Sequence, residues 1–319
     1  MSDQSSAATS SATTSSPTTS SPGADAEKPE SVPGSKKSDP ILVVDSIRRS
    51  FGGLVAVDVD HLEIQRNKIT ALIGPNGAGK TTFFNLITGF DEPDGGTWAY
   101  NGEDMGSLPA HRVALKGMVR TFQLTKALSR LTVIENMKLG AQRQRGENLF
   151  RSFNHRAWKA EEAEIEARAD VLLKRFKMDH MREEFAGTLS GGQRKLLEMA
   201  RALMTNPQLI MLDEPMAGVN PALTQSLLGH VKDLREEGHT VVFVEHDMDV
   251  VRDISDWVVV MAEGRIIAEG THEEIGANTD VIDAYLGRHH DAELTIDGDN
   301  PFGDDESDPA AQDSKPEDE

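Results

Sequence analysis

The sequence predicts an α/β fold with a parallel core sheet, an antiparallel β side sheet and a helical subdomain. Three observations predict it: an alternating segment near the start, an insertion rich in helix-forming residues, and four short, continuously apolar runs separated by helical patterns. Continuously apolar strands are typical of parallel sheets that are covered on both faces.

Each predicted part follows from one stretch of the chain. Apolar and polar residues alternate over residues 41–64, which predicts the antiparallel side sheet. Residues 127–189 are rich in Ala, Arg, Glu and Leu, which predicts the helical subdomain. The apolar runs are residues 68–73, 209–212, 240–244 and 257–261, and Gly or polar residues directly follow the first three. Ligands of parallel sheets bind at the carboxyl ends of the strands, so we expect a site there.

The two ends of the chain differ in composition from the middle. Residues 1–40 begin with a Ser- and Thr-rich stretch, and residues 289–319 are dominated by Asp and Glu. Neither segment has the apolar side chains that would offset the entropy of ordering it. We therefore expect one folded domain over residues 41–288 between two disordered tails, and deletion of residues 1–35 and 291–319 should leave the fold nearly unchanged.

Charge and composition exclude several classes of function. The net charge is −20; the last 29 residues hold 12 acids and one Lys, and the first 40 hold five acids and three Lys, which leaves −7 for the middle. A nucleic-acid partner is not expected, because phosphate binding needs a basic footprint. The absence of Cys excludes disulfides and thiolate metal sites. We see neither a signal pattern nor a run of about 20 apolar residues, so we expect a cytoplasmic chain.

A phosphate-binding loop follows the first apolar run. The sequence Gly-Pro-Asn-Gly-Ala-Gly-Lys-Thr at residues 74–81 fits the P-loop pattern G-x-x-x-x-G-K-[ST]. The glycines allow backbone N–H groups to face a phosphate chain, and the following helix, from about Thr82, adds its positive end. Lys80 would contact the β and γ phosphates, and Thr81 would offer a hydroxyl to Mg²⁺. A Gly-rich turn with a solvated Lys is the alternative, but the position between a strand and a helix favours the P-loop.

An acidic pair follows the second apolar run. Asp213 stands where an acid at a strand end can hold hydrated Mg²⁺, which is the Walker B arrangement. Glu214 follows it and could polarise an attacking water. Paired acids are also common helix caps, so this interpretation depends on the P-loop being present in the same chain.

The sequence Leu-Ser-Gly-Gly-Gln at residues 189–193 precedes a helix whose apolar residues fall on one face by spacing. A Ser-Gly-Gly turn at a helix N-terminus is a second anion site. With these motifs at these spacings, residues 41–287 resemble the ATP-binding-cassette (ABC) ATPases. That resemblance implies that residues 190–193 bind the γ-phosphate of an ATP held by another subunit, and that no covalent intermediate is required.

The resemblance assigns further roles, residue by residue. Gln123 matches the Q-loop Gln, which reaches Mg²⁺ and the water, and His246 matches the switch His, which contacts the γ-phosphate. Asn220 stands where many members have Asp in the D-loop, which puts a charged cross-dimer contact in doubt. Phe51 matches the aromatic residue that stacks on adenine, although Tyr is more usual there and a core position is the alternative.

These assignments give the complete predicted site. The predicted catalytic residues are Glu214, His246 and Gln123, and the predicted Mg²⁺ ligands are Thr81, Gln123 and Asp213. The predicted ATP-binding residues are Phe51, Gly74, Pro75, Asn76, Gly77, Ala78, Gly79, Lys80, Thr81, Thr82, Ser190, Gly191, Gly192 and Gln193.

Finer resemblance points to a subclass. Residues 50–57, 84–90, 120–123, 213–221 and 280–287 are similar to the ATPases of branched-chain amino-acid importers. This implies a second, different ATPase, two membrane permease subunits and an external binding protein, with the chain held at the cytoplasmic face of the membrane. The apolar residues Leu124, Leu128 and Leu131 are expected to line the groove that receives a permease helix.

Several alternatives stay open at this point. ATPases of urea and lipid or lipopolysaccharide systems are near relatives, and exporter ATPases share the fold. A soluble ABC ATPase in translation or repair is disfavoured, because the chain has one cassette and no sustained heptads. A regulator with a dead site is disfavoured by the presence of Lys80, Asp213, Glu214 and His246 together.

Overall fold

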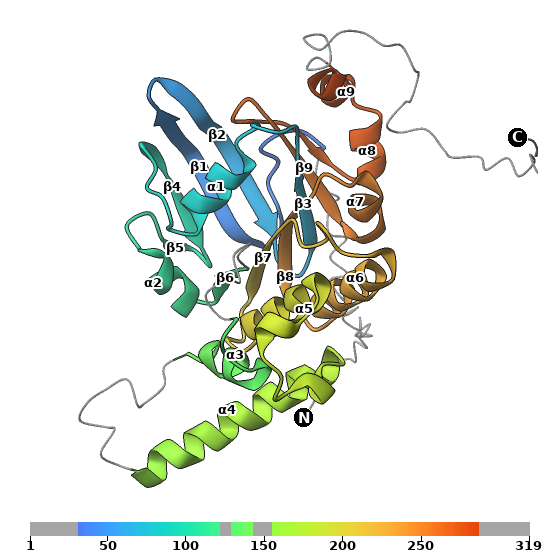
Figure 1. The fold of residues 1–319 in the computed structure, drawn as a ribbon. Helices are drawn as coiled ribbons and strands as arrows, with labels where there is room; N and C mark the ends of the chain where they lie inside the picture. The colour runs from blue at the N-terminus through green and yellow to red at the C-terminus, as the bar shows by residue number, and fades with distance from the viewer. Residues whose placement is uncertain (1–30, 122–128, 143–154, 287–319) are drawn as a thin grey trace, which may run out of the picture.

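A computed structural model of the protein describes residues 31–121, 129–142 and 155–286 (Figure 1). Its strands are β1 (Pro40–Phe51), β2 (Leu54–Gln65), β3 (Ile69–Ile73), β4 (Gly95–Tyr100), β5 (Glu103–Asp104), β6 (Met118–Arg120), β7 (Leu209–Asp213), β8 (Thr240–Val244), β9 (Trp257–Ala262) and β10 (Arg265–Gly270). Its α-helices are α1 (Lys80–Ile87), α2 (Ala110–Leu115), α3 (Val133–Leu139), α4 (His155–Arg175), α5 (Gly191–Leu203), α6 (Pro221–Glu236), α7 (Met248–Ile254), α8 (His272–Gly276) and α9 (Thr279–Leu286).

The core sheet has the strand order β10-β9-β3-β8-β7-β6. The pairs from β9 to β6 are parallel, and β10 is an antiparallel edge strand paired with β9. The four apolar runs form β3, β7, β8 and β9, which confirms the predicted parallel sheet. The carboxyl ends of β3, β7 and β8 therefore lie at one edge, where β3 leads into the P-loop and β7 into Glu214.

The side sheet has the order β2-β1-β4-β5, with antiparallel pairing throughout. Alternate residues of the core strands face two different cores. Leu72, Met211 and Val242 pack with the side sheet and α1, whereas Ala71 and Leu212 pack with α5, α6 and α7. Because both faces of the core sheet are covered, its strands have no polar face, as their sequences indicate.

The helical part of the chain extends away from the core sheet. Residues 129–142 and 155–189 contain α3, α4 and two short 3-10 turns, Asp179–Met181 and Ala186–Thr188. These helices lie at the end of the molecule away from β1 and β2 (Figure 1). Thr132 caps α3 in a reciprocal capping box with Glu135. The apolar faces of α3 and α4 join α5 in the larger of the two cores.

The start of the folded domain lies before residue 41, which corrects the predicted tail boundary. Ser35 and Lys37 are buried, and the Lys37 ammonium forms a 2.8 Å ion pair with Glu269 in which the two side chains are 2% and 0% exposed. The Ser35 N–H and the Trp257 indole also donate to the Glu269 carboxylate. A buried carboxylate needs such partners, because an unpaired one is costly to remove from water.

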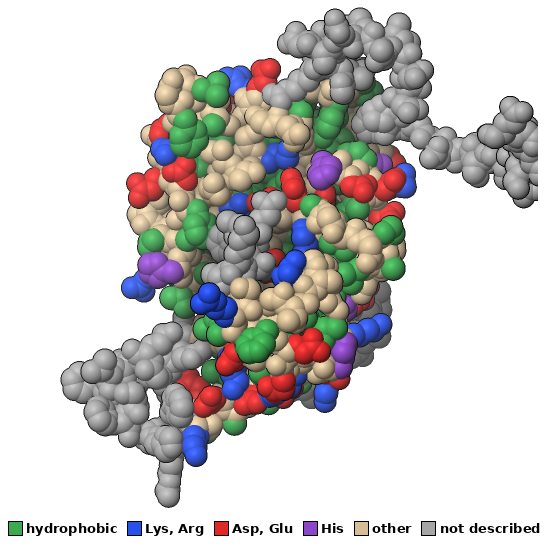
Figure 2. Space-filling model, viewed as in Figure 1, with side chains coloured by type: hydrophobic (Ala, Val, Ile, Leu, Met, Phe, Trp, Pro, Cys, Tyr) green, Lys and Arg blue, Asp and Glu red, His purple; other side chains and the backbone are tan. Residues whose placement is uncertain are grey.

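The surface carries charges of both signs. Figure 2 shows acidic and basic side chains interspersed over the face in view, with apolar side chains scattered among them. Among the described residues, none of the helices is both long and apolar enough to span a bilayer.

Candidate functional site

The loop after β3 has a shape that only glycine permits at two positions. Gly74 has φ 148°, and a Cβ there would lie 2.0 Å from the carbonyl oxygen of Met261. Gly79 has φ 100°, and its Cβ would lie 2.3 Å from the Ala56 carbonyl oxygen. These close approaches bring the loop against β9 and β2 and fix its curl. Residues 74–79 of the predicted P-loop therefore form a single curled turn between β3 and α1, and Lys80 and Thr81 begin α1.

Lys80 begins α1 and folds back over this turn. Its ammonium donates to the carbonyl oxygens of Gly74 at 2.6 Å and Pro75 at 3.1 Å. Gly79 occupies the N-cap position of α1 without a side-chain cap. The helix N-terminus thus presents main-chain N–H groups and a Lys cation at one place, which is the chemistry that binds phosphate. Thr81 is exposed and Thr82 is half-buried beside them.

The acidic pair at the end of β7 is held by groups from three other elements. The Asp213 carboxylate accepts from the Arg120 guanidinium at 2.7 Å, and the same guanidinium donates to the Asn85 side chain at 2.6 Å. Glu214 has φ 45°, a left-handed conformation that costs a non-glycine residue about 1–2 kcal/mol. Its N–H donates to the Val244 carbonyl at 3.0 Å, and its carbonyl accepts from the Lys195 ammonium at 2.6 Å.

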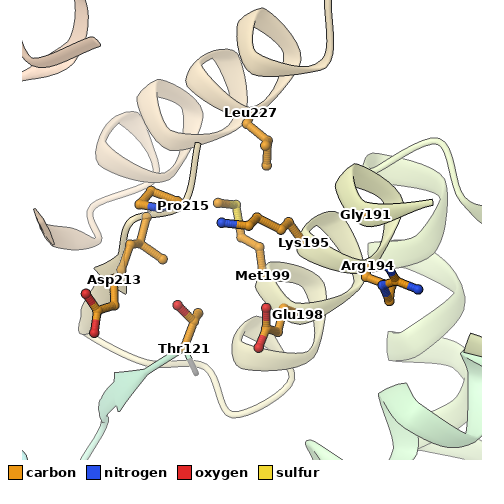
Figure 3. Close-up of a pocket in the computed structure, with 10 residues that line it drawn as sticks. Thr121, Gly191, Arg194, Lys195, Glu198, Met199, Asp213, Pro215 and Leu227 are labelled. Atoms are coloured by element: carbon orange, nitrogen blue, oxygen red, sulfur yellow. The ribbon is translucent and has the colours of Figure 1, made fainter. Parts of the chain in front are cut away.

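Lys195 and Asp213 line one cavity of about 230 Å³ between α5, α6 and the end of β7. Figure 3 shows Lys195 reaching across this cavity from α5 toward the turn at Pro215, with Thr121 and Glu198 beside it. Burial lowers the pKa of Lys195, against the opposing effect of nearby carboxylates, among them Glu245 and Glu198. Burial also raises the pKa of Glu198 to about 7.

The end of β8 contributes a buried carboxylate and an exposed imidazole. The Glu245 side chain is 1% exposed and accepts from the Met216 N–H at 2.9 Å, which ties β8 to the turn that follows Glu214. Burial raises the pKa of Glu245 above its ordinary value. The His246 side chain is 67% exposed, with Nδ1 3.9 Å from a Glu245 oxygen. His246 is therefore free to contact a ligand at the sheet edge.

The Ser-Gly-Gly turn forms the N-terminus of α5. The Ser190 hydroxyl accepts from the Gln193 N–H, and the Gln193 side chain accepts from the Ser190 N–H at 2.8 Å. Gly192 is buried, and a Cβ there would lie 2.0 Å from the Leu223 side chain, whereas Gly191 has open space around it. Ser190 and Gly191 are exposed, so this turn is accessible to a second chain.

Phe51 and Gln123 are the residues predicted to contact adenine and to reach Mg²⁺ with its water. Phe51 ends β1 with 49% of its surface exposed, and the Arg49 guanidinium lies 4.8 Å from its ring centroid. This exposure differs from that of a core residue. Gln123, together with Leu124 and Leu128 of the expected docking segment, lies outside the described residues.

The residues present suit a nucleotide with Mg²⁺. Mg²⁺ is bound in proteins through one or two carboxylates, with substrate phosphates and water completing the shell. Thr81 and Asp213 supply a hydroxyl and a carboxylate oxygen of the right type. Among the described residues no group of three His, Asp or Glu side chains could hold a metal ion.

Sequence reasoning missed the groups that hold the acidic pair. Arg120, Lys195 and Glu245 each look like ordinary charged residues in the sequence. The sequence holds one signal for Lys195. It lies next to the apolar face of α5 that Leu196, Met199 and Leu203 form. A charged residue at the border of a buried face is a candidate for a specific partner.

Comparison with known proteins identifies the family. Residues 57–217 match the ABC transporter family. The protein is 42% identical over 252 residues to the high-affinity branched-chain amino acid transport ATP-binding protein BraF of Pseudomonas aeruginosa, covering 78% of this chain and 99% of BraF. The chain belongs to the ABC transporter family. The activity of this family is ATP hydrolysis coupled to transport, so this ABC cassette is an ATPase that binds ATP.

Further relatives of this ABC cassette agree. Residues 265–291 match the branched-chain amino acid ATP-binding cassette transporter family. The LivG protein of Escherichia coli, a high-affinity branched-chain amino acid transport ATP-binding protein, is 40% identical over 252 residues, which cover 78% of this chain and 99% of LivG.

Solved structures show the same fold. A nucleotide-free ATP-binding cassette from an ABC transporter superposes with a TM-score of 0.68 at 36% identity, covering 77% of this chain and 98% of that one. The structure of an ATP-binding cassette of an ABC transporter in its ADP conformation has a TM-score of 0.68 at 36% identity, covering 78% of this chain and 99% of that one. The predicted P-loop ABC ATPase fold is confirmed.

Proposed function

We propose that this cassette is the ATP-hydrolysing subunit of an importer that takes up branched-chain amino acids. The observation that carries the proposal is the match of residues 265–291 to the branched-chain amino acid cassette family, because this segment lies outside the general ABC match. Relatives named for the same transport, at 40–42% identity over nearly their full length, support it.

The partners follow from the same proposal. A second ABC ATPase, of a different sequence, would face this chain, and two membrane permease subunits would hold the pair at the cytoplasmic face of the membrane. An external binding protein would deliver the amino acid to the permeases. The exposed Ser190 and Gly191 support a second cassette. They form an anion-binding turn that is accessible to another chain, and they lie far in the sequence from the P-loop of their own chain.

The proposed site lies between two cassettes. The turn of residues 74–82 would hold the phosphates of one ATP, Phe51 would stack on its adenine, and residues 190–193 of the second cassette would contact the γ-phosphate. Bound Mg²⁺, held by Thr81, Asp213 and Gln123, would neutralise charge on the phosphates.

The hydrolytic step would depend on groups at the ends of β7 and β8. The Glu214 carboxylate would accept a hydrogen bond from the attacking water and orient it in line with the γ-phosphate. The exposed His246 would hold the γ-phosphate oxygens through its ring N–H. Lys80 would leave the Gly74 and Pro75 carbonyls to contact the phosphates, which places a cation where negative charge is greatest.

The test is transport by the reconstituted complex. The complex purified with its own permeases should take up labelled leucine into vesicles with ATP and Mg²⁺, and Lys80→Ala should abolish uptake. Urea and lipopolysaccharide should be tested under the same conditions. ATP-dependent movement of urea or of a lipid in place of leucine would reject the proposed cargo and retain the ATPase.

A further inference from the structure

Lys195 forms a side-chain hydrogen bond to the Glu214 backbone. Its ammonium donates to the Glu214 carbonyl oxygen at 2.6 Å, and the Ala217 N–H also donates to that oxygen at 3.2 Å. On the other side, the Glu214 N–H is fixed to Val244 of β8 at 3.0 Å. The residue is thus held from two directions, by the core sheet and by α5.

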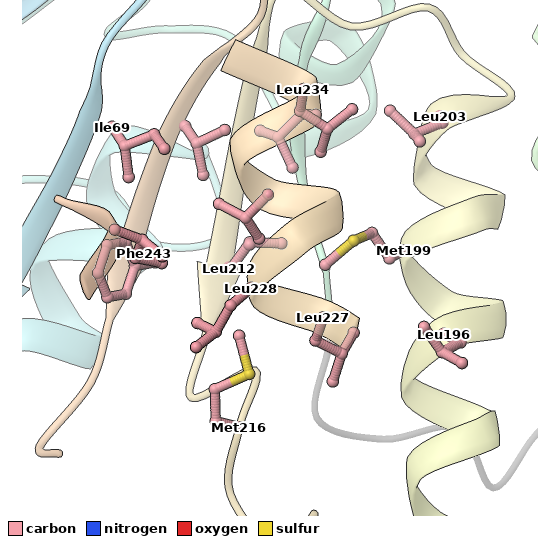
Figure 4. Close-up of a cluster of buried hydrophobic side chains, with 14 of the residues drawn as sticks. Ile69, Leu196, Met199, Leu203, Leu212, Met216, Leu227, Leu228, Leu234 and Phe243 are labelled. Carbon is pink, nitrogen blue, oxygen red and sulfur yellow. The ribbon is translucent and has the colours of Figure 1, made fainter. Parts of the chain in front are cut away.

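The helix that carries Lys195 also carries the turn that is exposed to a second chain. Ser190 caps α5, and Lys195 lies just over one turn further along it. On the next turns Leu196, Met199 and Leu203 face α6 and the core sheet, where Figure 4 shows Met199 and Leu196 directed toward Leu227. Because this face is packed, a movement of the α5 N-terminus is transmitted along the helix rather than absorbed within it.

The Glu214 main chain needs such support. Its φ of 45° is in the left-handed region, which a residue with a side chain keeps only where its surroundings hold it. The ammonium is half-buried among the carboxylates of Asp213, Glu214, Glu198 and Glu245, and burial lowers its pKa while they raise it. Removing its charge takes away a cation that acts on all four of these carboxylates.

We propose that Lys195 is a positioning residue for Glu214, which links the orientation of α5 to the placement of the Glu214 carboxylate. This deepens the proposed function, because it assumes that Glu214 assists the attacking water. When α5 is seated, Lys195 would fix the carbonyl and, through the backbone, the direction of the carboxylate. When α5 is displaced, the contact is broken and the carboxylate loses its fixed direction. Hydrolysis would then depend on the state of α5 within the same chain.

The first test uses Lys195→Met, which keeps the stem and removes the donor. In the complex with its partners, kcat should fall roughly 10- to 100-fold while the KM for ATP stays within about two-fold, since displacement of a reacting group by about 1 Å has effects of this size. Lys195→Arg, which keeps a cation, should recover most of the turnover. Lys232→Met, an exposed Lys of α6, is the matched control and should behave as wild type. Thermal unfolding of the nucleotide-free chains checks that each variant folds.

The second test combines Lys195→Met with Glu214→Gln. If Lys195 acts through Glu214, the double variant should be no more than about two-fold slower than Glu214→Gln alone, because effects of residues that act as a unit are not additive. The ATP-bound dimer of Glu214→Gln should form equally well in the double variant. A multiplied loss, or loss of the dimer, would show a general structural role and overturn the proposal.

The outcomes separate this proposal from the function that it assumes. A slow Glu214→Gln with a normal Lys195→Met would overturn the role of Lys195 and leave the role of Glu214 standing. Near-normal turnover of Glu214→Gln would overturn both. A rise in KM without a change in kcat for Lys195→Met would assign Lys195 to nucleotide binding instead.

Discussion

At the scale of single residues, two cations flank the acidic pair at the end of β7. Lys195 contacts the Glu214 backbone, and Arg120 forms a 2.7 Å ion pair with the Asp213 carboxylate, with the two side chains 7% and 12% exposed. Arg120 therefore stands where Mg²⁺ is proposed to share the same carboxylate. If Mg²⁺ binds Asp213 as proposed, it would compete with Arg120 for this carboxylate during nucleotide loading.

Replacing Arg120 should separate these two roles. Arg120→Gln leaves a nearly buried carboxylate unpaired, so the free energy of unfolding of the nucleotide-free chain should fall by about 3 kcal/mol. Mg²⁺ with ATP should restore more stability to the variant than to wild type, because Asp213 no longer has another cation. Melting curves with and without Mg²⁺–ATP measure both effects. An equal loss of stability relative to wild type in the two conditions would contradict competition between Arg120 and Mg²⁺ for Asp213.

Glu198 predicts a pH dependence of stability. Its pKa is raised to about 7 by burial, so between about pH 4.5 and 7 the folded chain holds a proton that the unfolded chain has lost. The contribution of Glu198 to the free energy of unfolding is therefore largest below the pKa of the unfolded chain. It falls as the pH rises toward the pKa of the folded chain. Glu198→Gln should remove that fall and gain about 1–2 kcal/mol at pH 8. Denaturant unfolding at pH 5 and pH 8 measures it; an equal slope with pH in both proteins would contradict the assignment.

At the scale of elements, the strands could be predicted and several contacts could not. Continuous apolar runs indicated β3, β7, β8 and β9, because a buried parallel strand needs apolar side chains on both faces. The P-loop and the acidic pair could be predicted as well, because each directly follows one of these apolar runs. The Lys37–Glu269 pair could not be predicted, since its partners are 232 residues apart and each looks like a solvated charge in the sequence.

The N-terminal segment ahead of β1 is the element that the sequence misplaced. Lys37→Met should cost about 3–5 kcal/mol, because it leaves the fully buried Glu269 carboxylate without its cation. Lys36→Met, at the exposed neighbouring position, is the matched control and should change stability by less than about 0.5 kcal/mol. Chemical denaturation of the three proteins measures this.

A pair of truncations tests the same boundary. Removal of residues 1–30 should leave the melting temperature unchanged, whereas removal of residues 1–37 should lower it by as much as Lys37→Met or more. Equal stability of the two truncated proteins would show that the segment ahead of β1 contributes nothing, as the sequence alone suggested.

At the scale of the whole molecule, the proposed hydrolytic site requires two cassettes. The curled loop with Lys80, the acidic pair and His246 lie at the carboxyl edge of one core sheet, and the exposed Ser190 lies at the N-terminus of α5. In the proposed mechanism a second chain would complete the site, and closure of the two chains on ATP would move the permeases. Binding and hydrolysis should therefore be separable by single substitutions.

The most direct measurement compares Glu214→Gln with Lys80→Ala in the presence of the second ATPase, ATP and Mg²⁺. Glu214→Gln keeps its shape and loses its charge, so turnover should fall about 10²–10⁴-fold while the ATP-bound dimer accumulates. Lys80→Ala should lose phosphate affinity and remain unpaired. Near-normal turnover of Glu214→Gln, or a Lys80→Ala chain that still pairs on ATP, would contradict the assignment of roles at this site.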